Sequence, residues 1–192
     1  MKIIIGLGNP GEKYKNTRHN VGFRIIDELR EKESFSAFKL QKESKALVCE
    51  GSLNNKGIAL AKPMTFMNTS GSSAKNLIGY YNMKYKTEDE SILIIHDDID
   101  LPLGKMKINT GKNSAGHKGV ESIIKELKTK DFIRIRIGVQ PKSGKPKSVE
   151  NFVLKNFTKD EEIILNEVAE NTIEAIKLIL EKGLEKAMNK YN

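Results

Sequence analysis

Polar side chains that could hydrolyse a bond follow two apolar segments of the sequence. Asn9 comes soon after the apolar residues 3–5, and Asp97 follows the apolar run 92–95. A histidine can take a proton from water, and a carboxylate can orient and polarise its ring. His19 stands at a predicted helix start, where we expect the positive end of the helix to lower its pKa and keep it neutral. His19 and Asp97 are therefore candidate catalytic residues, with a capping or surface role as the alternative for His19, and Asn9 lies at a strand end where open α/β sheets bind ligands.

Residues 6–11 read GLGNPG and fit the fingerprint of a dinucleotide-binding turn. Such a site needs a helix that opens at the third glycine and an acidic residue about 20 positions later at a strand end. Pro10 and the polar stretch 12–16 precede any helical periodicity, and Glu31 falls inside a predicted helix. We expect a tight turn that delivers Asn9 to a site, with no dinucleotide and no other cofactor.

A metal site is the main rival interpretation of the polar residues. Imidazole and carboxylate groups are suitable ligands for a hard metal, but the chain has no H-E-x-x-H or EF-hand spacing. Turn and helix-start roles explain the same residues, so we expect no metal. The glycine-rich turn 114–119 before a helix could instead bind an anion through its backbone N–H groups. The residues considered above as metal ligands are His96, Asp97, Asp98, Asp100 and His117.

The periodicity of the apolar residues predicts an α/β protein with a single domain, 1–192. Its mixed β-sheet should be covered by helices on both faces. Residues 140–148 are basic and contain proline and glycine, which predicts a mobile loop. A capping box at 158–161 opens a C-terminal helix from about residue 159. Strands are expected at 2–6, 46–50, 57–61, 91–95, 105–108 and 133–139, and further helices at 17–32, 72–81 and 120–127.

The composition favours a soluble protein with a polyanionic partner. The 192 residues include 33 Lys and Arg against 25 Asp and Glu, a net charge of +8. A net positive charge favours nucleic acid, although a lysine-rich surface can also serve solubility alone. No apolar run could cross a bilayer, there is no signal peptide pattern, and the single Cys49 makes no disulfide framework. We expect a cytoplasmic protein with no membrane partner.

Five motifs in a fixed order resemble the bacterial-type peptidyl-tRNA hydrolases over essentially the whole chain. Each motif alone would be weak, but their order and spacing together are highly specific. They are GLGNPGEKY at 6–14, TRHNVG at 17–22, KPMTFMNTSG at 62–71, HDDIDLP at 96–102 and AGHKG at 115–119.

This resemblance implies a monomeric, metal-independent esterase. Members of the family cleave the ester between a peptide and the terminal ribose of tRNA, and so recycle tRNA from aborted translation. By resemblance, His19 is the general base for water and Asp97 holds its imidazole in the basic form. Asn9 would help to distinguish a blocked amino group from a free one. Tyr14, Phe66 and Asn68 match positions that contact the acyl-terminal end of the substrate.

Two positions depart from the family pattern. Lys118 stands where the family usually has a substrate-binding asparagine; a lysine keeps N–H donors but adds a charge and lacks the amide acceptor. Asn109 stands where a basic residue often joins an arginine, here Arg136, to grip a phosphate near the acceptor stem and 3′ end of the tRNA. We hypothesise that Lys107 or Lys112 substitutes for it. Alternatives to the enzyme are an RNA-binding module that has lost activity and a metal-dependent phosphoesterase.

Overall fold

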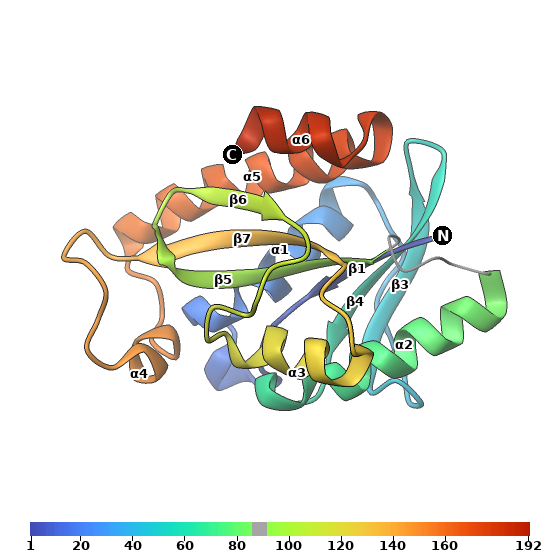
Figure 1. The fold of residues 1–192 in the computed structure, drawn as a ribbon, viewed down its shortest axis with the longest axis horizontal. Coiled ribbons are helices and arrows are strands. Elements are labelled where there is room, and N and C mark those ends of the chain that lie inside the picture. Colours follow the sequence, from blue (N-terminus) through green and yellow to red (C-terminus); the bar gives the residue numbers. More distant parts are fainter. Residues whose placement is uncertain (86–91) are drawn as a thin grey trace.

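A computed structural model describes residues 1–85 and 92–192 of the chain. Seven strands form one sheet in the order β2-β3-β4-β1-β5-β7-β6 (Figure 1). Ser91, the first residue of an expected strand, lies outside the described residues. The strands are β1 (Lys2–Gly6), β2 (Lys39–Gln41), β3 (Ala46–Leu53), β4 (Lys56–Pro63), β5 (Ile92–Pro102), β6 (Met106–Asn109) and β7 (Ile133–Gln140), and the helices are α1 (Val21–Lys32), α2 (Ser70–Tyr85), α3 (Lys118–Leu127), α4 (Val149–Val153), α5 (Lys159–Lys182) and α6 (Leu184–Tyr191).

The sheet is mixed, which confirms the predicted fold class. The four central strands β4, β1, β5 and β7 run parallel to one another. Strands β2 and β3 at one edge and β6 at the other pair antiparallel with their neighbours. The carboxyl ends of the parallel strands therefore meet at one edge of the sheet, which is where open α/β sheets bind ligands.

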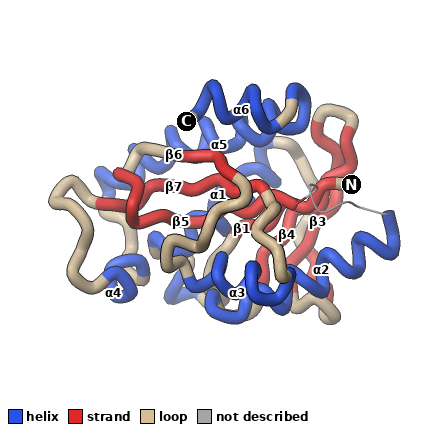
Figure 2. Tube along the Cα trace, in the orientation of Figure 1, coloured by secondary structure: helices blue, strands red, loops and turns tan. Residues whose placement is uncertain are grey.

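Helices cover both faces of the sheet, as the sequence predicted (Figure 2). One core lies between the sheet and the helices α1, α5 and α6, and the other lies between the sheet and α2 and α3. In β1, Ile4 packs in the first core while Ile3 and Ile5 pack in the second. This burial on two faces explains why three successive positions of β1 are apolar.

Several local signals act as expected. Asn54 and Asn55 form the β3–β4 turn with φ of 51° and 59°, which matches the twist of the hairpin. The side chain of Thr158 accepts a hydrogen bond from the Glu161 N–H, and this capping box opens α5. The C-terminal helix is broken at Gly183, where φ is +88°, so that α6 is a separate helix.

Gly6 and Gly8 of GLGNPG allow close packing of the chain against α1. A Cβ at Gly6 would lie 2.2 Å from the Gly22 carbonyl oxygen, and one at Gly8 would lie 2.6 Å from the Phe23 ring. Helix α1 begins at Val21, ten residues after the motif ends. Only a three-residue 3-10 turn, Glu12–Tyr14, follows Gly11, whereas a dinucleotide turn has an α-helix that opens at the third glycine.

The contact of α1 with the sheet makes a stability prediction at Gly22. A Cβ there would lie 2.4 Å from Leu7 N and 2.5 Å from Ile95 O, so the Gly22→Ala variant must shift α1 or the strands. We expect a loss of about 1–3 kcal/mol in the free energy of unfolding, measured by urea denaturation. The control is Gly79→Ala in α2, where a Cβ meets nothing within 4 Å; it should be neutral or stabilising. Equal stabilities of the two variants would contradict this account.

Among the described residues, every helix is too short or too polar to cross a membrane.

Candidate active site

A cavity of about 620 Å³ opens at the carboxyl edge of the parallel strands. The loops after β1 and β4, the end of β5 and the start of α3 contribute to its wall, and α4 closes the far side. Six of the nine residues predicted from sequence for the site line this cavity: Asn9, His19, Phe66, Asn68, Asp97 and Lys118. Tyr14, Lys107 and Arg136 are not among the lining residues.

His19 and Asp97 both line the cavity and are hydrogen-bonded to each other. The two atoms His19 Nδ1 and Asp97 Oδ1 are 2.8 Å apart, and both side chains are largely buried. His19 belongs to a short 3-10 turn, Arg18–Asn20, that precedes α1. The buried Arg18 anchors this turn, because its guanidinium donates to the carbonyl oxygens of Lys155 and Asn156. Segments that are 78 residues apart in the sequence thus form one histidine–carboxylate pair.

The pKa of His19 is governed by burial and by the carboxylate of Asp97 rather than by the helix start. Burial would lower the pKa of the imidazole, but the nearby Asp97 outweighs burial and raises that pKa above its ordinary value of 6.5. The expectation that the helix start lowers the pKa is therefore wrong. The helix end acts weakly here because α1 begins two residues later and the ring bonds directly to a carboxylate. Burial opposes ionisation of Asp97, yet its two histidine neighbours hold its pKa well below the usual range.

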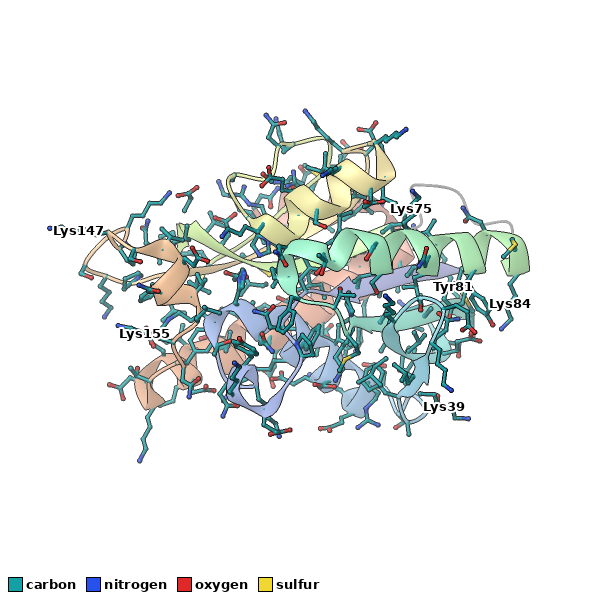
Figure 3. The ribbon with its side chains drawn as sticks, turned by 90° about the horizontal axis from the view of Figure 1, so that it is seen from below. Lys39, Lys75, Tyr81, Lys84, Lys147 and Lys155 are labelled. Atoms are coloured by element: carbon teal, nitrogen blue, oxygen red, sulfur yellow. The ribbon has the colours of Figure 1, made fainter. Side chains whose placement is uncertain are left out.

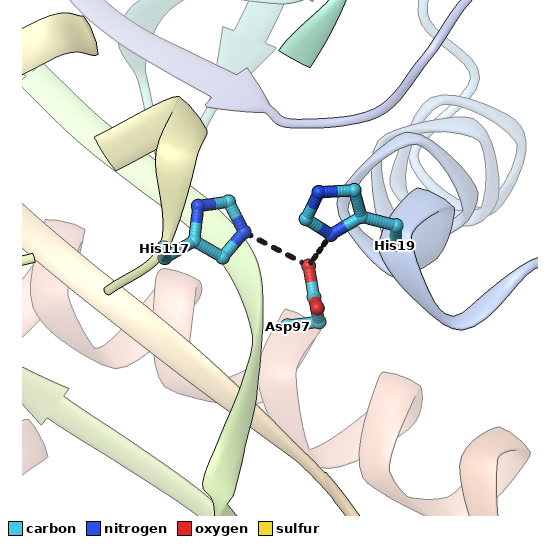
Figure 4. A group of neighbouring side chains, drawn as sticks. All are labelled: His19, Asp97 and His117. Carbon is cyan, nitrogen blue, oxygen red and sulfur yellow. Dashed lines mark hydrogen bonds and ion pairs between the residues drawn. The ribbon is translucent and has the colours of Figure 1, made fainter. Parts of the chain in front are cut away.

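His117 contacts the same carboxylate oxygen from the opposite side (Figure 4). Its Nε2 lies 2.9 Å from Asp97 Oδ1. Its Nδ1 accepts hydrogen bonds from the backbone N–H groups of Gly119 and Val120, each at 3.2 Å, and so caps α3. A ring nitrogen that accepts two hydrogen bonds carries no hydrogen, so the hydrogen of the neutral ring must be on Nε2. His117 therefore donates to Asp97.

Of the five residues in the metal hypothesis, only Asp97 and His117 belong to a group of possible ligand atoms that comes together among the described residues. Asp98 pairs with Arg136, the exposed Asp100 pairs with Lys145, and His96 Nδ1 donates to the backbone oxygen of Asp97. In the described part of the chain, that group is completed by His19: His19, Asp97 and His117 offer ligand atoms within 4.8 Å of one another. A metal ion bound to Nε2 of His117 would have to displace its hydrogen to Nδ1, where α3 requires an acceptor. The donor set fits proton handling better than metal binding.

A small network fixes the orientation of Asn9. Its backbone N–H donates to Asn20 Oδ1 and its carbonyl accepts from Asn20 Nδ2, each at 2.9 Å. Its side-chain Oδ1 accepts from the Met67 N–H at 2.8 Å. The side-chain oxygen is thereby occupied, and the Nδ2 group is left to donate into the cavity that Asn9 lines.

Comparisons with known proteins identify the family of this chain. A family model described as peptidyl-tRNA hydrolase matches residues 3–192. The chain belongs to the peptidyl-tRNA hydrolase family. The peptidyl-tRNA hydrolase of Thermodesulfovibrio yellowstonii is 45% identical over 194 residues, which cover 100% of this chain and 99% of that protein. The one from Alkaliphilus metalliredigens is 42% identical and is covered over its full length.

Solved peptidyl-tRNA hydrolase structures share the fold. The crystal structure from Acinetobacter baumannii superposes with a TM-score of 0.88 at 31% identity, over 100% of this chain and 94% of that chain. The structure of 5′-methylthioadenosine nucleosidase from Arabidopsis thaliana reaches a TM-score of 0.51 at 8% identity. That second likeness shows only a related fold, so the family assignment rests on the sequence and on the closer superposition.

At the cavity mouth of this peptidyl-tRNA hydrolase family member, Lys118 forms an ion pair. Its Nζ lies 3.1 Å from Glu150 Oε1 on α4, and both side chains are mostly exposed. Phe66 is 58% exposed on the same rim. An exposed ion pair contributes little to stability and can open at low cost. The lysine at this family position is thus available to a ligand.

The predicted phosphate contacts lie on neighbouring strands outside the cavity. Lys107 on β6 is the register partner of Arg136 on β7, and Asn109 is the partner of Arg134. Arg136 donates to Asp98 Oδ2 at 2.6 Å and is partly exposed. Lys107 is exposed. Lys107 and Arg136 are therefore directly opposite each other on adjacent strands. Arg134 is buried and donates to the Asn113 carbonyl.

Two contacts of the site were not predicted from the sequence. His117 was considered as a metal ligand or a helix-start residue, but its hydrogen bond to Asp97 was not expected. Asn20 was given no role, and it holds both backbone polar groups of Asn9. Its place beside His19 in the TRHNVG motif was the available signal.

Proposed function

We propose that this chain hydrolyses the ester between the peptidyl group and the terminal ribose of peptidyl-tRNA, and so recycles tRNA from aborted translation. The observation that carries the proposal is the His19–Asp97 hydrogen bond inside a cavity, in a chain that belongs to this family. We also propose that it acts as a monomer, as the resemblance to the family implies. The cytoplasm is the compartment where such a substrate arises.

His19 is the general base in this proposal. Its Nδ1–H donates to ionised Asp97, which leaves Nε2 with a lone pair for a proton. Nε2 takes a proton from water, and the water oxygen attacks the ester carbonyl carbon. The tetrahedral intermediate then releases the ribose oxygen, which takes up the proton from His19. An ester is suited to this mechanism because an alcohol leaves more readily than an amine.

Amide groups around the cavity would hold the acyl end of the substrate. The Nδ2 of Asn9 can donate to a peptide carbonyl, which an N-blocked substrate has and a free aminoacyl group lacks. Asn68 can donate to the carbonyl oxygen as negative charge develops on it. Exposed Phe66 offers an apolar face to the peptide, and Tyr14 is proposed to contact its outer part.

The charge of the surface supports a tRNA partner. The net charge is +8, and exposed lysines bind phosphates by releasing counterions. Lys147 and Lys155 lie on either side of α4, and Lys39, Lys75 and Lys84 lie toward the other end of the same view (Figure 3). We assign Lys107 and Arg136 to the acceptor stem, and Lys118 to the 3′ end beside the cavity.

A hydrolysis assay tests the proposed function. The purified chain is incubated with N-acetyl-aminoacyl-tRNA, with and without a chelator, and the released N-acetyl amino acid is measured. We expect turnover that survives the chelator, and much slower turnover with free aminoacyl-tRNA. Loss of activity in chelator would favour the metal-dependent phosphoesterase. Tight tRNA binding without any turnover would favour the RNA-binding module.

Lys107 should contribute to substrate affinity but not to chemistry. In Lys107→Ala, we expect KM to rise with kcat unchanged, because a phosphate contact is lost equally in the ground and transition states. The slope of log affinity against log salt should fall by about 1. Lys32→Ala, at the far end of α1 from His19, makes the same charge change as a control. If Lys107→Ala and Lys112→Ala both bind tRNA like the wild type, neither lysine replaces the family's basic residue.

A further inference from the structure

His117 connects two parts of the molecule through one ring. Its Nδ1 accepts from the first N–H groups of α3, and its Nε2–H donates to Asp97 Oδ1. The His117 side chain is only 8% exposed, and its ring lies between the rings of His19 and His96, at centroid distances of 4.9 and 4.6 Å. Little room remains for the ring to turn to another rotamer.

The backbone of α3 selects the tautomer of this ring. If the hydrogen of the neutral ring moved to Nδ1, it would point at the N–H groups of Gly119 and Val120, which need an acceptor. The same movement would leave a bare Nε2 lone pair facing the Asp97 carboxylate at 2.9 Å. Both changes are unfavourable, so His117 presents an N–H to Asp97 as long as α3 is formed.

The second donor restrains Asp97 at the atom that matters for His19. Asp97 Oδ1 receives one N–H from His19 and one from His117, on elements from opposite sides of the site. His96 adds a third restraint, because its Nδ1–H donates to the backbone oxygen of Asp97. A carboxylate held by a single hydrogen bond could rotate, and the ring of His19 would rotate with it.

We propose that His117 is a positioning residue for the His19 base: it aims Asp97 through a tautomer that the first turn of α3 fixes. This inference rests on the proposed function, since the base acts in that reaction. It assigns His117 no contact with the reacting atoms. It also assigns the ring two separable tasks, one at Nδ1 and one at Nε2.

Two substitutions separate these tasks. In His117→Asn, the side-chain oxygen takes the place of Nδ1 and remains a good N-cap, but no group reaches Asp97. In His117→Gln, the amide nitrogen takes the place of Nε2 and can still donate to Asp97, while the cap is lost. If His117 positions Asp97, the asparagine variant should lose about 10- to 100-fold in kcat with KM little changed. The glutamine variant should keep most of kcat and have the lower midpoint of thermal unfolding.

The pH profile gives a readout that a purely structural role would not move. Without the His117 donor, the Asp97 carboxylate interacts more strongly with His19 and raises the pKa of His19 further. The acid limb of kcat/KM should therefore move to higher pH in the asparagine variant. Lys118 on α3 and Glu150 on α4 also face His19, and they are unchanged in both variants. Equal losses of kcat in the two variants, with an unmoved acid limb, would overturn the inference and leave His117 as a helix cap.

The tautomer can be measured without turnover. Long-range ¹H–¹⁵N correlation spectra of the folded protein should show His117 with its hydrogen on Nε2. A hydrogen on Nδ1 would refute the inference even if the enzyme is fully active. A wild-type chain that shows the expected tautomer but no hydrolysis would instead refute the proposed function, and with it any catalytic role for this restraint.

Discussion

Replacing His19 by alanine should lower kcat for peptidyl-tRNA hydrolysis by about 10²–10⁴-fold, the usual contribution of a positioned general base. The substitution removes the imidazole that faces the cavity and leaves Asp97 without one of its two donors. Water in the cavity must then attack the ester without proton transfer to the protein. The measurement is the single-turnover release of N-acetyl amino acid from tRNA at saturating enzyme.

The His19→Ala variant should still bind tRNA. The predicted phosphate contacts Lys107 and Arg136 lie on β6 and β7, outside the cavity, so fluorescence anisotropy with deacylated tRNA should give an unchanged affinity. Thermal unfolding provides a control for folding, because Arg18 and Asn20 continue to hold the turn. Activity at the wild-type level would mean that another group activates water and that His19 is misassigned.

The sequence predicted the layered fold well because the spacing of apolar residues indicates which positions are buried. The apolar runs and alternations mark the central strands, and burial on both faces accounts for Ile3, Ile4 and Ile5. The extent of β5 was not predictable in this way. That strand continues to Pro102, past the expected end at residue 95, because buried polar residues replace apolar ones while the backbone goes on pairing with β7.

The C-terminal helix shows a different limit. Apolar spacing from Ile163 to Leu184 predicts one continuous stripe, yet Ile163 is 71% exposed and the helix breaks at Gly183. A single glycine disfavours a helix by about 1 kcal/mol but is tolerated inside many helices, so Gly183 alone does not predict a break. Gly183 takes a φ of +88°, which lies outside the helical region, and the chain beyond it packs as α6 beside β6.

The site was predictable as a set of residues but not as a network. The family motifs pointed to Asn9, His19 and Asp97, and the structure brings all three to one cavity. The contacts of Asn20 with Asn9 and of His117 with Asp97 depend on where the loops cross the sheet edge. The raised pKa of His19 has the same origin, since a carboxylate 78 residues away outweighs the local effect of the helix start.

Replacing Asp97 by asparagine should lower kcat by about 10²–10⁴-fold, as much as the loss of the base. The substitution replaces only one carboxylate oxygen by an NH₂ group. Both partners of Oδ1 are N–H donors, which an ionised carboxylate can satisfy together. An amide can accept at its oxygen, but its NH₂ group can only donate. If the NH₂ group faces His19, the ring takes the other tautomer, with its hydrogen on Nε2, and the base loses its lone pair.

The pH dependence distinguishes this mechanism from a loss of folding. In the wild type, Asp97 raises the pKa of His19, so kcat/KM should increase with pH through a value above 6.5, as the base loses its proton. In Asp97→Asn, burial acts without the carboxylate, and the acid limb should move below that of the wild type. Asp131→Asn, before β7, makes the same chemical change in an exposed position and should leave both rate and profile unchanged. An acid limb that does not move in Asp97→Asn would show that the carboxylate does not set the proton affinity of the base.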